Sequence, residues 1–272
     1  MSLMSFIKHS DRGVVYMAAP NIKADHAFTT RFGGVSAGVY ASMNLGLGSG
    51  DSIEHIRENY SLLCAALGIT VSDIVCSRQV RGADVRAVTY ADRGGLFTPY
   101  SPEADALVTC DPGAALLVFT ADCVPILLHD PVRGACGAVH SGWQGTAAGV
   151  VVAAVGEMVS RYGCNASDIT AAIGPCISEC CFETDRDVPD AMAGMLGDDL
   201  GACMREQNGK FMVDLKKANK LLLNRAGLHD ISISDECTSC RCDKYWSHRK
   251  TAGSGRGSQA AIIVAGTGAP YN

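Results

Sequence analysis

The chain has 272 residues, of which 47% are hydrophobic and only 19% are charged, so it can bury a large core and lacks the composition of a disordered protein. A net charge of −5 at pH 7 excludes the basic surface on which nucleic-acid-binding proteins depend, and no apolar run is long enough to span a membrane. Thirteen cysteines without an export signal indicate reduced thiols, and we therefore expect a cytoplasmic protein with a small-molecule partner.

The sequence predicts that strands and helices alternate along the chain. Residues 27–30 end a strand, Asp51 and Ser52 precede a helix over 53–67, and Gly68 ends that helix. Further strands are predicted at 85–89, 104–109, 114–119, 134–139, 171–177, 231–234 and 260–265, and further helices at 145–162, 187–200 and 214–226. This order predicts an α/β (α+β) fold, a single domain over residues 1–272 with mixed β-sheets and packed helices. Residues 1–3, ahead of Met4, are interpreted as a remnant of cloning outside the fold.

Two chemically capable side chains follow the central strands. Cys123 lies in the run Thr-Ala-Asp-Cys-Val-Pro, and His140 lies in Ala-Val-His-Ser-Gly-Trp. A nucleophilic thiol needs a neighbouring base, cation or metal that lowers its pKa, and His140 or Arg81 could supply this. The alternative is an inert thiol in the core. The helix predicted to begin near Gly145 presents free N–H groups that suit an anion such as phosphate.

A second cysteine motif lies near the end of the chain. Cys237 and Cys240 have the spacing of a zinc-binding pair, but structural zinc usually takes four ligands, and the sequence shows no second pair with suitable spacing. Cys176, Cys180 and Cys181 could complete such a site in space. The alternative is a simple turn beside the active site.

Several motifs occur in a fixed order along nearly the whole chain. They are Arg31-Phe-Gly-Gly-Val-Ser, Met43-Asn-Leu-Gly, Gln79-Val-x-Gly-Ala, Ala104-Asp-Ala, Thr120-Ala-Asp-Cys-Val-Pro, Ala138-Val-His-Ser-Gly-Trp, Ile173-Gly-Pro-Cys-Ile and Cys237-Thr-x-Cys. In this order they resemble the YfiH/YlmD laccase-domain family, which is also called polyphenol oxidase or DUF152.

The resemblance implies a CNF1/YfiH-like single domain, a cytoplasmic monomer and a metal site of histidine, cysteine and histidine that holds zinc or, less often, copper. It also implies phosphorolysis of purine nucleosides (adenosine, inosine, guanosine and methylthioadenosine) with adenosine deaminase activity. Other members are described as laccases or as amidases that act on muropeptide precursors. The matching site positions in this chain are Arg81, Cys123 and His140.

The chain departs from this pattern at Arg81, where the family has histidine. Arginine stays protonated and has no lone pair to offer a metal, so Cys123 and His140 remain as the predicted metal ligands, and His248 or Cys242 is a conceivable substitute for the third. Two outcomes stay open. Arg81 stabilises a Cys123 thiolate in a metal-free site with His140 as acid and base, or the site has lost or changed its chemistry.

We therefore expect a purine nucleoside phosphorylase that takes a nucleoside and phosphate, with Cys123, His140 and Arg81 as catalytic residues. The predicted substrate- and phosphate-binding residues are Arg31, Asn44, Gln79 and Arg249. The alternatives are a cysteine-dependent hydrolase or amidase on a muropeptide precursor and a binding protein with a degenerate metal site. A copper oxidase is disfavoured, because a multicopper centre needs many histidines and the seven here are scattered.

Overall fold

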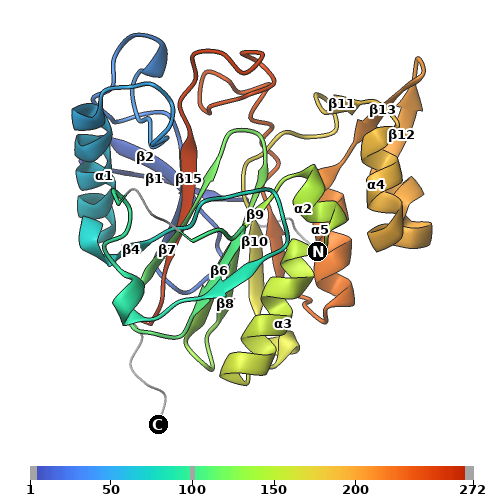
Figure 1. Cartoon of the computed structure of the whole chain (residues 1–272), viewed down its shortest axis with the longest axis horizontal. Coiled ribbons are helices and arrows are strands. Elements are labelled where there is room, and N and C mark those ends of the chain that lie inside the picture. The colour runs from blue at the N-terminus through green and yellow to red at the C-terminus, as the bar shows by residue number, and fades with distance from the viewer. Residues whose placement is uncertain (1–4, 99–101, 267–272) are drawn as a thin grey trace.

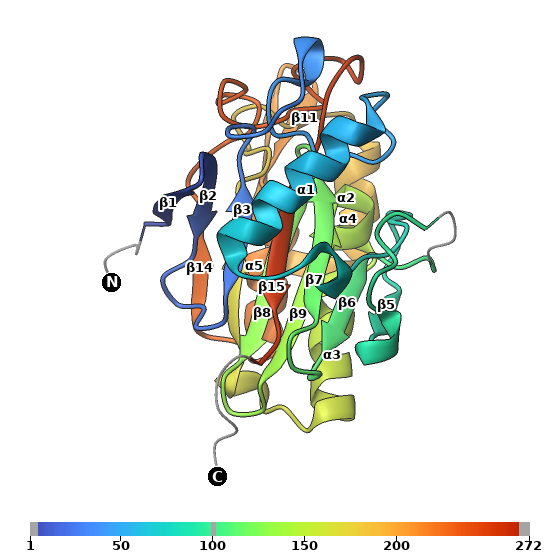
Figure 2. The same ribbon diagram turned by 90° about the vertical axis from the view of Figure 1, so that its left-hand side faces the viewer.

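Two six-stranded sheets stack face to face, one helix covers the outer face of the first sheet and several helices cover that of the second, so that the chain forms four layers (Figures 1 and 2). The computed structural model describes residues 5–98 and 102–266. The segment 1–3, predicted to be a cloning remnant, lies outside the described residues. None of the described helices is long and apolar enough to cross a membrane.

The first sheet has the strand order β1-β2-β3-β15-β7-β4. Its strands are β1 (Ile7–Asp11), β2 (Val14–Ala18), β3 (His26–Thr29), β4 (Ile74–Val75), β7 (Ala115–Thr120) and β15 (Gln259–Val264). Helix α1 (Ile53–Leu67) covers the outer face with Ile56, Tyr60 and Leu63, which recur at helical spacing. As predicted, Ser52 caps α1 and Gly68 ends it in a left-handed conformation.

The second sheet has the order β14-β10-β8-β9-β6-β5 and carries most of the helices. Its strands are β5 (Val85–Ala87), β6 (Ala106–Thr109), β8 (Val124–Asp130), β9 (Ala135–Ser141), β10 (Thr170–Ile173) and β14 (Ile231–Ile233). The helices on this side of the molecule are α2 (Trp143–Ala147), α3 (Val150–Tyr162), α4 (Asp187–Leu196) and α5 (Leu215–Arg225). In Figure 1 they lie on the opposite side of the sheets from α1.

Short elements complete the chain. A small three-stranded sheet at the edge of the molecule consists of β11 (Glu183–Thr184), β12 (Met204–Gln207) and β13 (Lys210–Val213) (Figure 1). The 3-10 turns are η1 (Gly38–Tyr40), η2 (Val71–Asp73), η3 (Tyr90–Asp92), η4 (Ala166–Asp168) and η5 (Gly197–Cys203).

Apolar side chains from both sheets meet in the middle of the stack. Phe28 and Ile263 from the first sheet pack in one cluster with Leu107 and Leu127 from the second. The sheets approach so closely that a Cβ atom on Gly174 would lie 2.2 Å from the Phe28 ring. Burial on both faces explains why the central strands read as continuous apolar runs.

The predicted α/β fold with mixed sheets and packed helices is confirmed, but two predicted helices differ from the structure. The helix expected over 145–162 is broken into α2 and α3 at Gly149, which has φ +76° and where a Cβ atom would lie 2.4 Å from Met195 Cε. The helix expected over 187–200 ends at Leu196, because Gly197 adopts a positive φ and begins the turn η5.

Candidate active site

Cys123 and His140 are neighbours because their strands pair. Cys123 lies in the turn between β7 of one sheet and β8 of the other, and β8 pairs with β9 so that Pro125 faces His140 and Val124 faces Ser141. The next residues in this register are Cys123 and Gly142. A Cβ atom on Gly142 would lie 3.1 Å from the Cys123 sulfur, so any larger residue at position 142 would crowd the thiol.

A buried carboxylate holds His140. Asp105, which lies just before β6 and is fully buried, accepts a hydrogen bond at 2.8 Å from His140 Nδ1, and its backbone carbonyl accepts one from the His140 amide. The bond to Nδ1 fixes the ring and leaves Nε2 as the other reactive nitrogen. Asp105 lies in the Ala104-Asp-Ala motif, but no role was predicted for it from the sequence. The signal for it was a carboxylate at the start of an otherwise apolar strand.

The turn that carries Arg81 wraps around the same carboxylate. Asp105 Oδ2 accepts backbone hydrogen bonds from Val80 at 3.1 Å and from Gly82 at 2.7 Å. Arg81, between them, has φ +65°, an uncommon conformation for a residue with a side chain. The anion that orients His140 therefore also positions the Arg81 turn.

Charges in this cluster favour a thiolate beside an imidazolium. Burial disfavours the charged thiol, but the neighbouring His140 outweighs it and lowers the pKa of Cys123, with a smaller effect of Arg81 in the same direction. Burial also opposes a charged His140, yet Cys123 and the hydrogen bond with Asp105 raise the pKa of His140 to about 9. At neutral pH the pair can thus hold a proton on His140 and a negative charge on Cys123.

A second buried carboxylate, Asp122, ties the Cys123 turn to two distant loops. Its oxygens accept hydrogen bonds from Thr238 Oγ1 at 2.6 Å, from Ser247 Oγ at 3.0 Å and from the Arg249 amide at 2.6 Å. Asp122 has φ +92° and therefore bends the chain sharply before Cys123. Asp122 lies in the Thr120-Ala-Asp-Cys-Val-Pro motif, but no role was predicted for it from the sequence.

Cys123 opens into a cavity of about 290 Å³. Three arginines line it together with His248, Asp122 and Gln144, and apolar side chains form much of the remaining wall. The arginines are Arg81, Arg249 and Arg256, and the apolar side chains include Trp143, Ile177, Phe182 and Leu215. His140 itself is a buried neighbour of Cys123, with 6% of its surface exposed. The arrangement places the Cys123 thiol, with the His140 imidazole behind it, at a pocket lined by three arginines.

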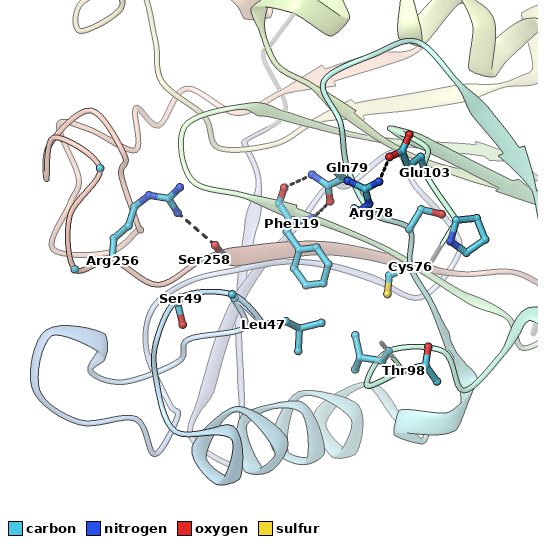
Figure 3. Close-up of a pocket in the computed structure, with 17 residues that line it drawn as sticks. Leu47, Ser49, Cys76, Arg78, Gln79, Thr98, Glu103, Phe119, Arg256 and Ser258 are labelled. Atoms are coloured by element: carbon cyan, nitrogen blue, oxygen red, sulfur yellow. Dashed lines mark hydrogen bonds and ion pairs between the residues drawn. The ribbon is translucent and has the colours of Figure 1, made fainter. Parts of the chain in front are cut away.

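Arg256 also lines a larger cavity of about 940 Å³, shown in Figure 3. Gln79 lies in its wall, but both ends of the Gln79 amide are hydrogen-bonded to the backbone of Phe119, at 2.9 and 2.7 Å. Arg78 forms an ion pair with Glu103 in the same wall. The predicted substrate residue Gln79 therefore fixes the 76–80 segment to β7.

The other predicted binding residues lie in different places. Arg249 lines the Cys123 cavity, and its guanidinium donates to the carbonyl oxygens of Cys181 and Glu183.

Arg31 donates to the carbonyl oxygens of Ala41 and Cys242 and stacks over Trp246, with 4.0 Å between the guanidinium carbon and the ring centroid. Asn44 bonds the backbone of Gly46 and Ser258. Both side chains hold loops together, and the structure does not bring them to the Cys123 cavity.

Cys123 and His140 do not form the three-ligand metal site that the resemblance implies. The Arg81 guanidinium cannot coordinate a metal, and its charge opposes a second cation. Within residues 5–98 and 102–266, no group of three or more His, Cys, Asp or Glu ligand atoms within 4.8 Å of one another includes Cys123 or His140. Of the conceivable substitutes, His248 lines the cavity and accepts a hydrogen bond from Arg256 on Nδ1 at 3.2 Å.

Comparisons with known proteins agree with the fold and the motifs. A family model described as "Multi-copper polyphenol oxidoreductase laccase" matches residues 25–266. The chain is 38% identical over 242 residues to "Purine nucleoside phosphorylase YlmD" of Geobacillus stearothermophilus, which covers 87% of this chain and 88% of that protein. It is 40% identical over 241 residues to "Purine nucleoside phosphorylase" of Deinococcus radiodurans, with 89% of each protein covered.

Solved structures show the same fold. The crystal structure of YlmD from Geobacillus stearothermophilus has a TM-score of 0.90 at 36% identity, covering 96% of this chain and 99% of that one. The Bacillus licheniformis hypothetical protein YfiH has a TM-score of 0.88 at 32% identity and covers 94% of this chain and 97% of that one. The predicted resemblance is confirmed, and the chain belongs to the YfiH/YlmD laccase-domain family.

Proposed function

We propose that this chain is a purine nucleoside phosphorylase whose chemistry takes place at Cys123, His140 and Asp105. Relatives that are 38% and 40% identical over nearly nine tenths of the chain carry that name. The observation that carries the proposal is a His140 held by the buried Asp105 carboxylate at 2.8 Å, which helps to raise the pKa of His140 to about 9, next to a Cys123 that opens into a cavity lined by three arginines. Phosphorolysis needs both features: a proton for the leaving purine and cations for the phosphate.

The three arginines of the cavity bind the phosphate in this proposal. Arg81, Arg249 and Arg256 approach from the turn before β5, from the 247–250 turn and from the loop before β15. Planar guanidinium groups pair well with phosphate oxygens. Trp143 and Phe182 provide the apolar surface on which a nucleoside can pack.

In the chemical step a phosphate oxygen attacks C1′ of the ribose while the bond from C1′ to N9 of the purine breaks. The electron pair of that bond goes to the purine, and His140 donates its proton to the base. The proton left on the new phosphate ester then returns to His140, so the enzyme ends as it began. Cys123 keeps its negative charge throughout and stabilises the protonated imidazole, and Asp105 keeps the ring in place.

The direct test is the product mixture that purified protein makes from inosine. We expect hypoxanthine and ribose 1-phosphate in equal amounts, with a rate that rises with phosphate concentration and vanishes without phosphate. Base release that is independent of phosphate would contradict the proposal, as would binding of inosine without turnover. With adenosine, adenine indicates phosphorolysis, and ammonia indicates the deaminase activity that the resemblance implies.

The thiolate–imidazolium pair also favours a second candidate, a cysteine-dependent hydrolase or amidase. A thiolate beside a protonated histidine is a nucleophile, and Cys123 lines the cavity. In that case the Cys123 sulfur would attack a substrate carbonyl and form a thioester as the carbon–nitrogen bond breaks, and His140 would protonate the leaving amine. Water would then hydrolyse the thioester, which releases the carboxylic acid and restores the Cys123 thiolate and the His140 proton. Amide hydrolysis of a muropeptide precursor that Cys123→Ser abolishes, together with inertness toward inosine, would establish this reaction in place of phosphorolysis.

A further inference from the structure

Four cysteines from two distant parts of the chain converge at one edge of the second sheet. Strands β10 and β14 are parallel neighbours, so the segments that follow them leave the sheet at the same end. The bridge between Cys176 and Cys237 continues this pairing, and the Thr238 amide donates to the Cys176 carbonyl at 3.0 Å. Cys180 and Cys181 then meet Cys237 and Cys240.

The spacing of the four sulfur atoms matches that of a tetrahedral metal site. All four lie within 4.8 Å of one another. The distances are 3.8 Å between Cys180 and Cys181, 3.6 Å between Cys180 and Cys240, and 3.4 Å between Cys181 and Cys240. Zinc–sulfur bonds of about 2.3 Å in a tetrahedron give sulfur–sulfur distances of about 3.8 Å. The thiols are free rather than joined as disulfides.

Backbone N–H groups point at the Cys237 sulfur, as they do at the thiolate ligands of metal sites. Cys237 Sγ accepts a hydrogen bond from the Ser178 amide at 3.4 Å, and the Ser239 and Cys240 amides also bond to it. Such N–H groups stabilise and orient a metal-bound thiolate. Cys237 is buried, whereas Cys180 and Cys240 are exposed, so an ion can reach the site from solvent.

We propose that Cys180, Cys181, Cys237 and Cys240 bind one zinc ion as a structural site, separate from Cys123 and His140. Four thiolates in tetrahedral geometry suit Zn²⁺, and a closed set of four ligands is typical of structural rather than catalytic zinc. From the sequence, Cys237 and Cys240 were a possible zinc-binding pair that Cys176, Cys180 and Cys181 could complete in space. The structure brings Cys180 and Cys181 into the group, and Cys176 stays outside it.

The four-cysteine site would stabilise one wall of the Cys123 cavity. Two residues near the four cysteines bond to Asp122: Thr238 through its hydroxyl at 2.6 Å and Ile177 through its amide at 2.9 Å to the Asp122 carbonyl. Phe182, next to Cys181, lines the cavity. Zinc would thus join the two loops that position the Cys123 turn, without touching the substrate.

The test uses the full chain with Cys123→Ser and His140→Ala, so that any metal at the active site is removed from the count. In protein purified under reducing conditions, elemental analysis should give about one zinc per chain. Cobalt(II) added after chelation should give the intense visible bands of a tetrahedral cobalt thiolate. In the same background, Cys180→Ser and Cys240→Ser should each reduce the zinc content to near zero.

Cys242→Ser is the matched control, because this half-buried thiol lies two residues from Cys240 outside the group. It should keep full zinc, and circular dichroism should show that all three serine variants are folded. Absence of zinc and of cobalt bands in the folded background protein would overturn the proposal. So would zinc retained in both Cys180→Ser and Cys240→Ser, or a thiol count showing that these cysteines form a disulfide.

Discussion

The charge of His140 is the residue property on which the proposed acid catalysis depends. In the folded chain the pKa of His140 is raised from 6.5 to about 9, so the stability from its protonated form is fully present below about 6.5 and is lost as pH rises through about 9. Activity should fall over the same upper range.

Asp105→Asn should move this loss of activity to lower pH, because it removes an anion that raises the pKa of His140. The measurement is the dependence of kcat/KM on pH. Asp84→Asn, which removes an exposed carboxylate near the same turn, is the control and should leave the profile in place. An unchanged basic limb in Asp105→Asn would show that Asp105 does not set the charge of His140.

We expect Arg81 to control whether the proposed active site can hold a metal. Arg81→His supplies a third ligand next to Cys123 and His140 and removes a repelling charge, so this variant should take up about one additional zinc ion. Elemental analysis in a Cys180→Ser/Cys240→Ser background isolates this zinc from the four-cysteine site. If the Arg81→His variant takes up no more zinc than the same background with Arg81 intact, residue 81 alone does not control metal binding at this site.

Gly142 should control the position of the Cys123 sulfur. Because a Cβ atom at 142 would lie 3.1 Å from that sulfur, Gly142→Ala should displace it and lower activity by about 10²-fold, as a shift of about 1 Å does in active sites. Gly156→Ala is the control, because this α3 glycine has open space around its Cα and alanine there should stabilise the helix by roughly 0.5–1 kcal/mol. Equal activity in both variants would contradict this role.

Among the structural elements, the turn before β8 depends on Asp122. Asparagine has the same size as aspartate and also tolerates the positive φ of residue 122. In Asp122→Asn, however, one accepting oxygen becomes an NH₂ donor that faces the hydrogen-bond donors of Thr238, Ser247 and the Arg249 amide. We expect the free energy of unfolding to fall by about 1–3 kcal/mol in chemical denaturation. Asp198→Asn, at an exposed site, should have little effect, and equal stability of the two variants would count against the role of Asp122.

Elements with local signals could be predicted from the sequence, and those set by distant contacts could not. Helix α1 was predicted with its ends because Ser52 and Gly68 lie at its boundaries. The break at Gly149 was missed because the space that requires a glycine is limited by Met195, which lies in another helix.

The same division holds within the site. Cys123 and His140 were found because each follows an apolar strand in a short polar motif. The roles of Asp105 and Asp122 depend on partners more than twenty residues away, which only the sheet register brings close. The sequence alone also could not show that the Gln79 amide bonds to the backbone of Phe119. Nor could it show that the Asn44 oxygen accepts from the backbone of Gly46 and Ser258 while its nitrogen donates to the side chains of Ser49 and Asp51.

For the molecule as a whole, the proposed active site lies where the chain passes from one sheet to the other. The connection from β7 to β8 carries Cys123, and β15, from the end of the described chain, fills the centre of the first sheet between β3 and β7 (Figure 2). The site therefore depends on packing between the two sheets. This explains how residues from six separate segments can meet at one cavity: 81, 121–123, 142–144, 177–182, 215 and 248–256.

The measurement that tests the central claim most directly is the rate of phosphate-dependent hypoxanthine release from inosine by His140→Gln and by the unmodified chain. Loss of the proton donor should lower kcat by about 10²–10⁴-fold, while inosine still binds in equilibrium dialysis. A His140→Gln variant that binds inosine and releases hypoxanthine at the unmodified rate would show that the Cys123, His140 and Asp105 cluster does not carry out the reaction.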